Sequence, residues 1–233
     1  MQINGATALV TGANRGLGRR FAQALLDRGA AKVYAGARDP ESVGLPGVVP
    51  VRLDITDPAQ VAAAASLAAD VDLLINNAGS STNAALVDGD LGDVRLEMET
   101  HYFGTLSVAR AFAPVLAANG GGALVNVLSV LSWTTLPPAS AYSAAKAAEL
   151  SLTNALRLSL ADQKTLVTAL HVGYMDTDMA AHVDGPKSDP QVIANLALDG
   201  VEAGQSEVVA DDVSRQVRAA LSGPLSLLYP DVA

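Results

Sequence analysis

The sequence contains no cysteine, and this absence excludes several kinds of site at once. Disulfide bonds, thiolate nucleophiles and zinc–cysteine sites all require cysteine side chains. The His, Asp and Glu residues do not show metal-ligand spacing either, so we expect no metal site. The chemistry of the protein is therefore expected from hydroxyl, amine, imidazole and carboxylate groups.

Positive charge is also scarce. Lys and Arg together number 15 against 24 Asp and Glu, the formal net charge is -9, and the basic residues form no cluster. A nucleic-acid partner is therefore not expected. No apolar run approaches the roughly 20 residues that span a bilayer, and the first ten residues, MQINGATALV, do not resemble a secretion signal. We expect a cytoplasmic protein without a membrane partner.

Hydrophobic residues make up 50% of the chain, and short apolar runs alternate with longer amphipathic stretches. This alternation predicts a single α/β domain over residues 1–233, with a Rossmann-type, doubly wound parallel sheet of about seven strands and helices on both faces. The expected strands are 6–10, 32–37, 47–53, 71–76, 123–128, 166–172 and 225–229, and the expected helices lie near 16–28, 58–69, 90–118, 140–162, 189–203 and 211–222.

The longest irregular stretch is 173–190. A long loop in a compact domain is usually functional or mobile. We interpret it as part of a substrate lid at about 173–200, the alternative being a plain surface connection.

A glycine-rich turn follows the first expected strand, with Gly12, Gly16 and Gly18 in the order T-G-x-x-x-G-x-G. Glycines at such a turn let a pyrophosphate approach the backbone and place it on the N-terminus of the next helix. A glycine turn alone is weak evidence. Its position between the first strand and the first helix of an alternating chain predicts a nucleotide site.

The end of the second strand indicates which dinucleotide is bound. NAD sites usually carry an acid there, about 20 residues after the glycines, to bind the adenosine ribose. Here the stretch reads AGARDP, with Arg38 near the expected position, and Arg15 lies within the glycine turn. Two guanidinium groups suit a 2′-phosphate, which favours NADP(H) over NAD(H). The alternative is two solvated arginines, with Asp39 as the ribose-binding acid.

Three further side chains suggest carbonyl chemistry. Ser129 ends an expected strand, and Tyr142 and Lys146 stand four residues apart on the next expected helix, so they share one face. A carbonyl that accepts hydride needs a proton donor at its oxygen. Lys146 and a positive nicotinamide ring would both lower the pKa of Tyr142, and Ser129 can hold the carbonyl oxygen by a hydrogen bond.

With these motifs the chain resembles the short-chain dehydrogenase/reductase family in its compact form, over residues 1–225. TGANRGLG resembles the family's cofactor turn, NNAG at 76–79 its sheet-steadying motif, LDITDP at 53–58 its adenine-binding segment, and S…YSAAK its active site. The resemblance implies that Tyr142 is the general acid in reduction and the base in oxidation, and that Lys146 binds the nicotinamide ribose.

The resemblance also assigns the remaining site residues. Expected cofactor contacts are Gly12, Asn14, Arg15, Gly16, Leu17, Gly18, Arg38, Asp54, Ile55, Asn77, Ala78, Gly79, Tyr142, Lys146, Gly173, Met175 and Thr177.

Two positions depart from the family pattern: Val172 precedes Gly173 where relatives usually have Pro-Gly, and His101 stands in the long fourth helix. Relatives usually have an Asn three residues before a Gly in the long fourth helix, where it anchors a water in a proton relay behind the Lys. Here His101 precedes Gly104. His101 is either a relay residue whose imidazole replaces the amide, a helix histidine satisfied by a local carbonyl, or a cause of impaired turnover.

The substrate residues are less constrained. Trp133 either lines the substrate pocket or caps the core, and Tyr174 and Met179, with Met175, would form an apolar mouth suited to hydrophobic carbonyl compounds. His171 is expected to be a satisfied strand-end histidine rather than a ligand, and His182 an exposed lid residue.

These features predict an NADPH-dependent carbonyl reductase, reversible to alcohol oxidation, that acts on a small apolar ketone or aldehyde. A non-catalytic or weakly active NADP-binding sensor on the same fold is the alternative. A sugar-nucleotide epimerase or dehydratase is disfavoured, since such relatives have longer C-terminal domains. The resemblance further implies a homodimer or homotetramer that associates through the helices at 90–118 and 140–162.

Overall fold

The computed structural model describes residues 1–230, whose centre is a parallel sheet of seven strands in the order β3-β2-β1-β4-β5-β6-β7. The strands are β1 (Thr7–Thr11), β2 (Lys32–Ala37), β3 (Val49–Arg52), β4 (Leu73–Asn76), β5 (Ala123–Val127), β6 (Leu166–His171) and β7 (Glu207–Val209). The order reverses between β1 and β4. Ligands of open α/β sheets bind at the carboxyl ends of the strands at such a reversal.

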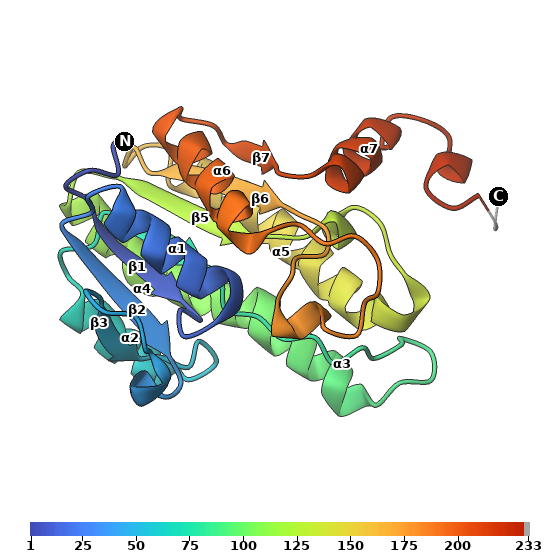
Figure 1. Cartoon of the computed structure of the whole chain (residues 1–233), viewed down its shortest axis with the longest axis horizontal. Helices are drawn as coiled ribbons and strands as arrows, with labels where there is room; N and C mark the ends of the chain where they lie inside the picture. Colours follow the sequence, from blue (N-terminus) through green and yellow to red (C-terminus); the bar gives the residue numbers. More distant parts are fainter. Residues whose placement is uncertain (231–233) are drawn as a thin grey trace.

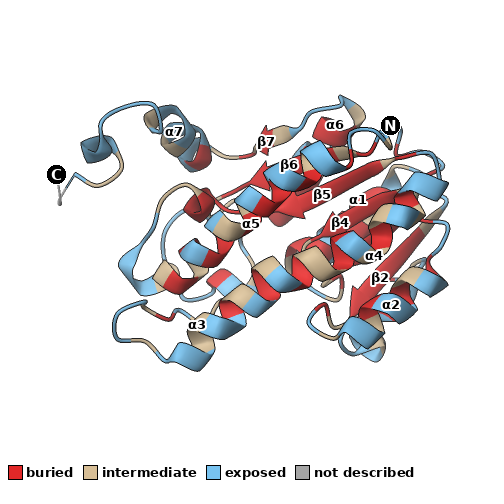
Figure 2. Ribbon diagram, turned by 180° about the vertical axis from the view of Figure 1, so that it is seen from behind, coloured by how far each residue is buried: buried red, intermediate tan, exposed pale blue. Residues whose placement is uncertain are grey.

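Helices cover both faces of the sheet (Figure 1). They are α1 (Gly16–Asp27), α2 (Pro58–Leu67), α3 (Leu91–Met98), α4 (Thr105–Ala118), α5 (Ser140–Ser159), α6 (Pro190–Glu202) and α7 (Asp212–Ala220). One hydrophobic core joins α1 and α6 to the sheet, with Phe21 and Leu198 fully buried. The other joins α2, α4 and α5 to it, with Phe112 and Leu116 fully buried. Figure 2 shows the central strands buried between these layers. The predicted fold class is confirmed.

The seventh strand was predicted in the wrong place. Residues 225–229 form no strand: Leu225–Leu227 is a short 3-10 turn whose two leucines are more than 60% exposed. The seventh strand is β7. This strand has only three residues, of which Val208 alone is buried, so the sequence gives little sign of it. A strand this short carries almost no periodic signal.

The long helix expected at 90–118 is interrupted. Residues Glu99–Gly104 form a π-helical segment between α3 and α4, and it contains His101. A side chain on Gly104 would overlap Ile55, so glycine lets this segment approach the loop after β3. Such π segments often mark functional sites.

The expected lid at 173–200 is too long. Residues 173–189 are irregular apart from a 3-10 turn at Asp178–Ala180, but α6 begins at Pro190 and packs against α1. Ile193 and Ala197 are fully buried in that contact, which makes the second part of the range a core helix. Among residues 1–230, no helix has both the length and the apolar character needed to cross a membrane.

Candidate active site

The glycine turn at the end of β1 has the close contacts that glycine alone permits. Gly12 and Gly16 have φ values of 67° and 53°, in the left-handed region that favours glycine. A Cβ atom on Gly18 would overlap the carbonyl oxygen of Gly12 and the amide of Asn77. The turn is therefore tight because two of its glycines bend the chain and the third lets α1 lie against it.

Asn77 and Thr11 clamp this turn to the next strand. The Asn77 side-chain amide donates to the carbonyl oxygens of Thr11 at 2.9 Å and Gly12 at 3.3 Å. The Thr11 hydroxyl accepts from the backbone N–H groups of Asn77 and Ala78, each at 2.9 Å. The NNAG motif thus holds the carboxyl ends of β1 and β4 together.

The N-terminus of α1 is suited to an anion. Arg15 is its N-cap and its side chain makes no capping hydrogen bond, whereas Asp57, Asp90, Asp189 and Asp211 cap α2, α3, α6 and α7. The first N–H groups of an uncapped helix are free to bind phosphate oxygens. Gly16, Leu17 and Gly18 supply them, while the Leu17 side chain is buried in the core. The turn therefore fits a dinucleotide pyrophosphate.

The residues expected around the adenosine lie at the same edge of the sheet. Arg38 follows β2, which pairs with β1, and its side chain is exposed. Asp39 caps the short 3-10 turn at Pro40–Ser42 by accepting from the N–H of Glu41 at 3.1 Å. Asp54 accepts from the N–H and the hydroxyl of Thr56, and Ile55 is buried beside Gly104. An exposed arginine, Arg38, and an acid engaged as a cap, Asp39, therefore follow β2, where a ribose 2′ group is expected, and the second arginine, Arg15, is exposed in the glycine turn.

The irregular segment at 173–189 meets the glycine turn. Thr177 lies next to Gly16, with the exposed Arg15–Asp178 ion pair at 3.5 Å beside it. Backbone bonds from Ser188 to Tyr174 and from Asp176 to Ser188 close the segment into a loop. A cavity of about 290 Å³ is lined by Gly16, Arg19, Arg20, Asp176, Thr177, Asp178 and Pro190.

Ser129, Tyr142 and Lys146 come together beyond the carboxyl end of β5. Ser129 is 7% exposed, and its hydroxyl oxygen accepts from the N–H of Leu131 at 3.1 Å, which leaves its proton free to donate. The Lys146 ammonium lies 5.8 Å from the centre of the Tyr142 ring. The geometry places a hydroxyl donor, a phenol and an ammonium around one point.

The charge environment of Tyr142 differs from the expectation. Burial raises the pKa of Tyr142 above its ordinary value, Lys146 and a hydrogen bond from Ser129 lower it, and the Glu149 and Glu97 carboxylates raise it. Together these effects raise the pKa of Tyr142. Lys146 lowers this pKa as expected, but its contribution is smaller than that of burial. A raised pKa keeps the phenol protonated, as a proton donor must be.

Lys146 is 4% exposed and is held from behind. Its ammonium donates to the carbonyl oxygen of Val127 and to the carboxylate of Glu149, both at 2.7 Å. The second Glu149 oxygen accepts from the Thr105 hydroxyl at 3.0 Å. Burial acts to lower the pKa of Lys146, but Glu149 and Tyr142 outweigh it and the pKa is raised.

His101 lies beside the same group, with its ring edge-to-face against Tyr142 at a centroid distance of 5.1 Å. Its Nε2 atom is 2.9 Å from the carbonyl oxygen of Ser80 and 3.2 Å from the carboxylate of Glu97. Its Nδ1 atom is buried, has no hydrogen-bond partner among residues 1–230, and lies 3.8 Å from Glu149. Nε2 thus lies at a local carbonyl, and Nδ1 faces the Glu149 carboxylate.

Gly79 of the NNAG motif makes room for this histidine, because a Cβ atom there would lie 2.8 Å from Cε1 of His101.

Comparison with known proteins agrees with this geometry. The sequence profile of the short chain dehydrogenase family matches residues 6–187. The chain belongs to the short-chain dehydrogenase/reductase family. Its members use a nicotinamide cofactor, and the chain is an oxidoreductase of this family.

Individual relatives support the same assignment. A short chain dehydrogenase from Burkholderia cenocepacia J2315, crystallised in complex with NADP, is 43% identical with a TM-score of 0.95, over 99% of this chain and 98% of that one. Dehydrogenase/reductase SDR family member 7B from Bos taurus is 33% identical over 79% of this chain, which spans 63% of its length. NADP-dependent 3-hydroxy acid dehydrogenase from Schizosaccharomyces pombe is 26% identical over 90% of this chain and 92% of its own.

The Trp133 side chain packs against His171 and Arg218. Its ring stacks on His171 at 3.7 Å, and the guanidinium of Arg218 lies 5.7 Å from its centre. His171 is fully buried, and Ser132 bonds its Nδ1 atom at 3.1 Å. Burial lowers the pKa of His171 to about 4, so it is neutral. His171 is buried at the end of a strand as predicted, but its Nε2 atom has no hydrogen-bond partner among residues 1–230, so the prediction that it is satisfied is wrong for that atom. The role of Trp133 in substrate binding stays a prediction.

The three side chains expected to form an apolar mouth differ in exposure. Tyr174 and Met179 are 43% and 48% exposed on the irregular segment, but Met175 packs against the core. Gly173 donates its N–H to the Asp211 carboxylate, which anchors the start of the segment to α7. His182 is exposed as predicted.

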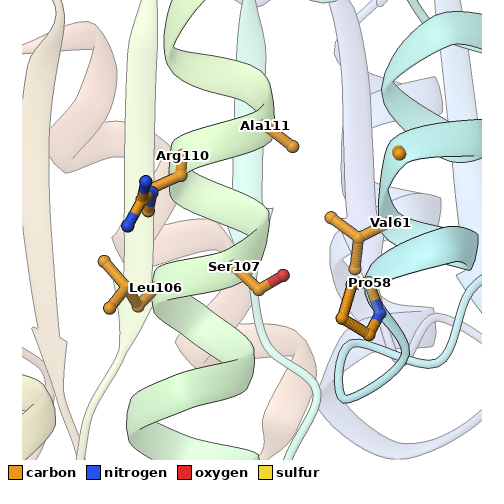
Figure 3. Close-up of a pocket in the computed structure, with 7 residues that line it drawn as sticks. Pro58, Val61, Leu106, Ser107, Arg110 and Ala111 are labelled. Carbon is orange, nitrogen blue, oxygen red and sulfur yellow. The ribbon is translucent and has the colours of Figure 1, made fainter.

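A second cavity, of about 460 Å³, lies between α2 and α4 (Figure 3). Its lining is Pro58, Val61, Ala62, Leu106, Ser107, Arg110 and Ala111. It contains none of the predicted site residues and no acid or base apart from Arg110. Among residues 1–230, no group of three or more His, Asp or Glu side chains is arranged to hold a metal ion.

Sequence reasoning missed Glu97 and Glu149, the two buried carboxylates of the site. Both left a signal in the sequence: Glu149 follows Lys146 by three residues and Glu97 precedes His101 by four, the spacings at which helical side chains meet.

Proposed function

We propose that the protein is an NADPH-dependent carbonyl reductase, reversible to alcohol oxidation, that acts on small apolar ketones or aldehydes. The observation that carries this proposal is the convergence of Ser129, Tyr142 and Lys146 beside a glycine turn suited to a dinucleotide. When bound, the reduced nicotinamide supplies a hydride. The substrate class rests on the exposed Tyr174 and Met179 side chains.

The chain's own residues then have distinct tasks. Ser129 donates a hydrogen bond to the carbonyl oxygen and fixes its position. The Tyr142 hydroxyl donates the proton that this oxygen needs, and in the reverse direction the phenolate accepts it. Lys146 binds the nicotinamide ribose and stabilises negative charge on the Tyr142 oxygen. His101 replaces the proton that Tyr142 has given up, and it does so through its Nδ1 atom, which is not engaged in a hydrogen bond among residues 1–230.

The preference for NADP(H) is supported by three observations. Arg38 is exposed after β2, where the ribose is expected, Arg15 is exposed in the glycine turn, and Asp39 is occupied as a cap. The 43% identical relative was crystallised with NADP. Equilibrium titration is expected to give a lower Kd for NADPH than for NADH, and Arg38→Asp is expected to abolish the difference. A native preference for NADH would contradict this assignment.

Activity is tested with a panel of ketones and aldehydes in the presence of NADPH, followed by the loss of its absorbance. We expect turnover of apolar carbonyl compounds. Tight NADPH binding without turnover of any panel member would favour the sensor alternative. Light scattering tests the accompanying proposal that the enzyme is a homodimer or homotetramer, and a centrifuged cell extract tests the proposed cytoplasmic location.

A further inference from the structure

Glu149 is a buried carboxylate that the proposed reaction does not use directly. It is 2% exposed, on α5 one turn after Lys146. A buried carboxylate without partners is strongly unfavourable, and Glu149 has two: the Lys146 ammonium at 2.7 Å and the Thr105 hydroxyl at 3.0 Å. Its position therefore depends on Lys146, and that of Lys146 on it.

The other groups around this pair have different partners. Glu97, on α3, is occupied by the N–H of Thr82, the hydroxyl of Ser80 and His101. His101, on the π-helical segment, lies 3.8 Å from Glu149, beyond hydrogen-bond distance. Among these charged groups, Glu149 is the one that contacts the ammonium.

We propose that Glu149 is a positioning residue that keeps Lys146 charged and fixed behind Tyr142. This inference rests on the proposed function, because it assigns a role in the same site. Lys146 donates to the Val127 carbonyl and to the Glu149 carboxylate. Two of its three N–H donors are therefore used within the protein, and the third can bind a ribose hydroxyl.

The charges of the buried cluster formed by Glu97, His101, Lys146 and Glu149 explain why Lys146 needs an ionic partner. Glu97 and Glu149 each bring a negative charge when ionised, Lys146 brings one positive charge, and His101 brings none or one. Without Glu149, Lys146 would be an ammonium buried without an ionic partner, and burial alone can lower a Lys pKa to about 5–6. Lys146 would then lose its charge within the pH range of an ordinary assay.

The test compares Glu149→Gln with the unsubstituted enzyme in NADPH-linked carbonyl reduction from pH 6 to pH 9. Glutamine keeps the shape and removes the charge. We expect the variant-to-native ratio of kcat/KM to fall at least tenfold as the pH rises, about tenfold per unit above the new Lys146 pKa. Glu99→Gln, the same change at an exposed residue of the π-helical segment, is expected to keep a constant ratio. A ratio for Glu149→Gln that does not change with pH would overturn the proposal.

A second measurement does not depend on activity. In urea unfolding of the full chain, Lys146→Met is expected to lower the midpoint, since it leaves Glu149 buried and unpaired. Adding Glu149→Leu to Lys146→Met is expected to raise the midpoint again. Additive losses would show that the two side chains are not paired. If the native protein reduces no carbonyl compound, the proposed function fails, while the urea cycle still reports on the pairing.

Discussion

At the scale of the residue, burial sets the charge of several side chains. His171 is fully buried against Trp133 with its pKa lowered to about 4 from 6.5, so the folded protein resists protonating it. Burial opposes the ionisation of Glu97, yet the hydrogen bonds from His101 and Thr82 outweigh it and hold the pKa at about 2. Both groups bind a proton less readily when folded, so both make the native state less stable as the pH falls.

His171 gives a signed prediction. Its pKa is depressed on folding, so the unfolded chain binds a proton between pH 6.5 and about 4 while the folded chain does not, and stability falls across that window. We expect His171→Gln to show a shallower loss of unfolding free energy between pH 6.5 and pH 4, measured by urea unfolding. The exposed His182→Gln variant is the control and should keep the native slope. Equal slopes for all three proteins would contradict a neutral, buried His171.

Glu97 acts at lower pH. A carboxyl whose pKa drops from 4.5 to about 2 contributes about 3 kcal/mol at neutral pH, and this contribution disappears as the pH falls from 4.5 towards 2. Glu97→Gln is therefore expected to destabilise the protein at pH 7 more than at pH 3, as measured by urea unfolding at the two values. A loss of equal size at both pH values would mean that the charge of Glu97 is not what stabilises the fold.

At the scale of the element, the β1–α1 turn contains a close contact that only glycine permits, at Gly18. A Cβ atom on Gly18 would overlap the carbonyl oxygen of Gly12. We expect Gly18→Ala to lower the unfolding free energy by about 1–3 kcal/mol through forced backbone shifts and to weaken NADPH binding. Gly44→Ala is a matched control, since nothing lies within 4 Å of a Cβ atom there. Equal stability and equal NADPH binding in both variants would contradict the tight turn.

Helices and strands that have a clear apolar pattern or a recognisable capping residue could be predicted from the sequence, and elements without these features could not. Six of the predicted strands and the capped start of α2 at Asp57 follow from apolar runs and turn residues. The three-residue β7 and the π-helical segment carry no such signal. The glycine turn and Tyr142–Lys146 could be read because their chemistry depends on local spacing. The Glu149–Lys146–His101 cluster depends on two helical segments meeting, α5 and the π-helical segment, and spacing on one helix shows this only in part.

At the scale of the whole molecule, apolar side chains remain exposed on the long helices. Phe103 is 49% exposed between α3 and α4, and Leu158 is 83% exposed on α5. Exposed apolar side chains on helices proposed for association are consistent with burial between copies. Figure 1 also shows α7 lying beyond the carboxyl end of β7.

Association through these helices can be measured directly. Light scattering is expected to give two or four times the chain mass of 23.7 kDa. Leu158→Lys is expected to shift the distribution towards a single chain, because a charge would be buried in the contact. A monomeric native protein would refute the proposed assembly.

The central claim is that Tyr142 supplies the proton in carbonyl reduction, and Tyr142→Phe tests it most directly. The variant is expected to bind NADPH with the native Kd and to lose about 10²–10⁴-fold in kcat, the usual contribution of a general acid. Tyr102→Phe, on the same π-helical segment as His101, is the matched control and should keep native turnover. Native turnover by Tyr142→Phe would contradict the account.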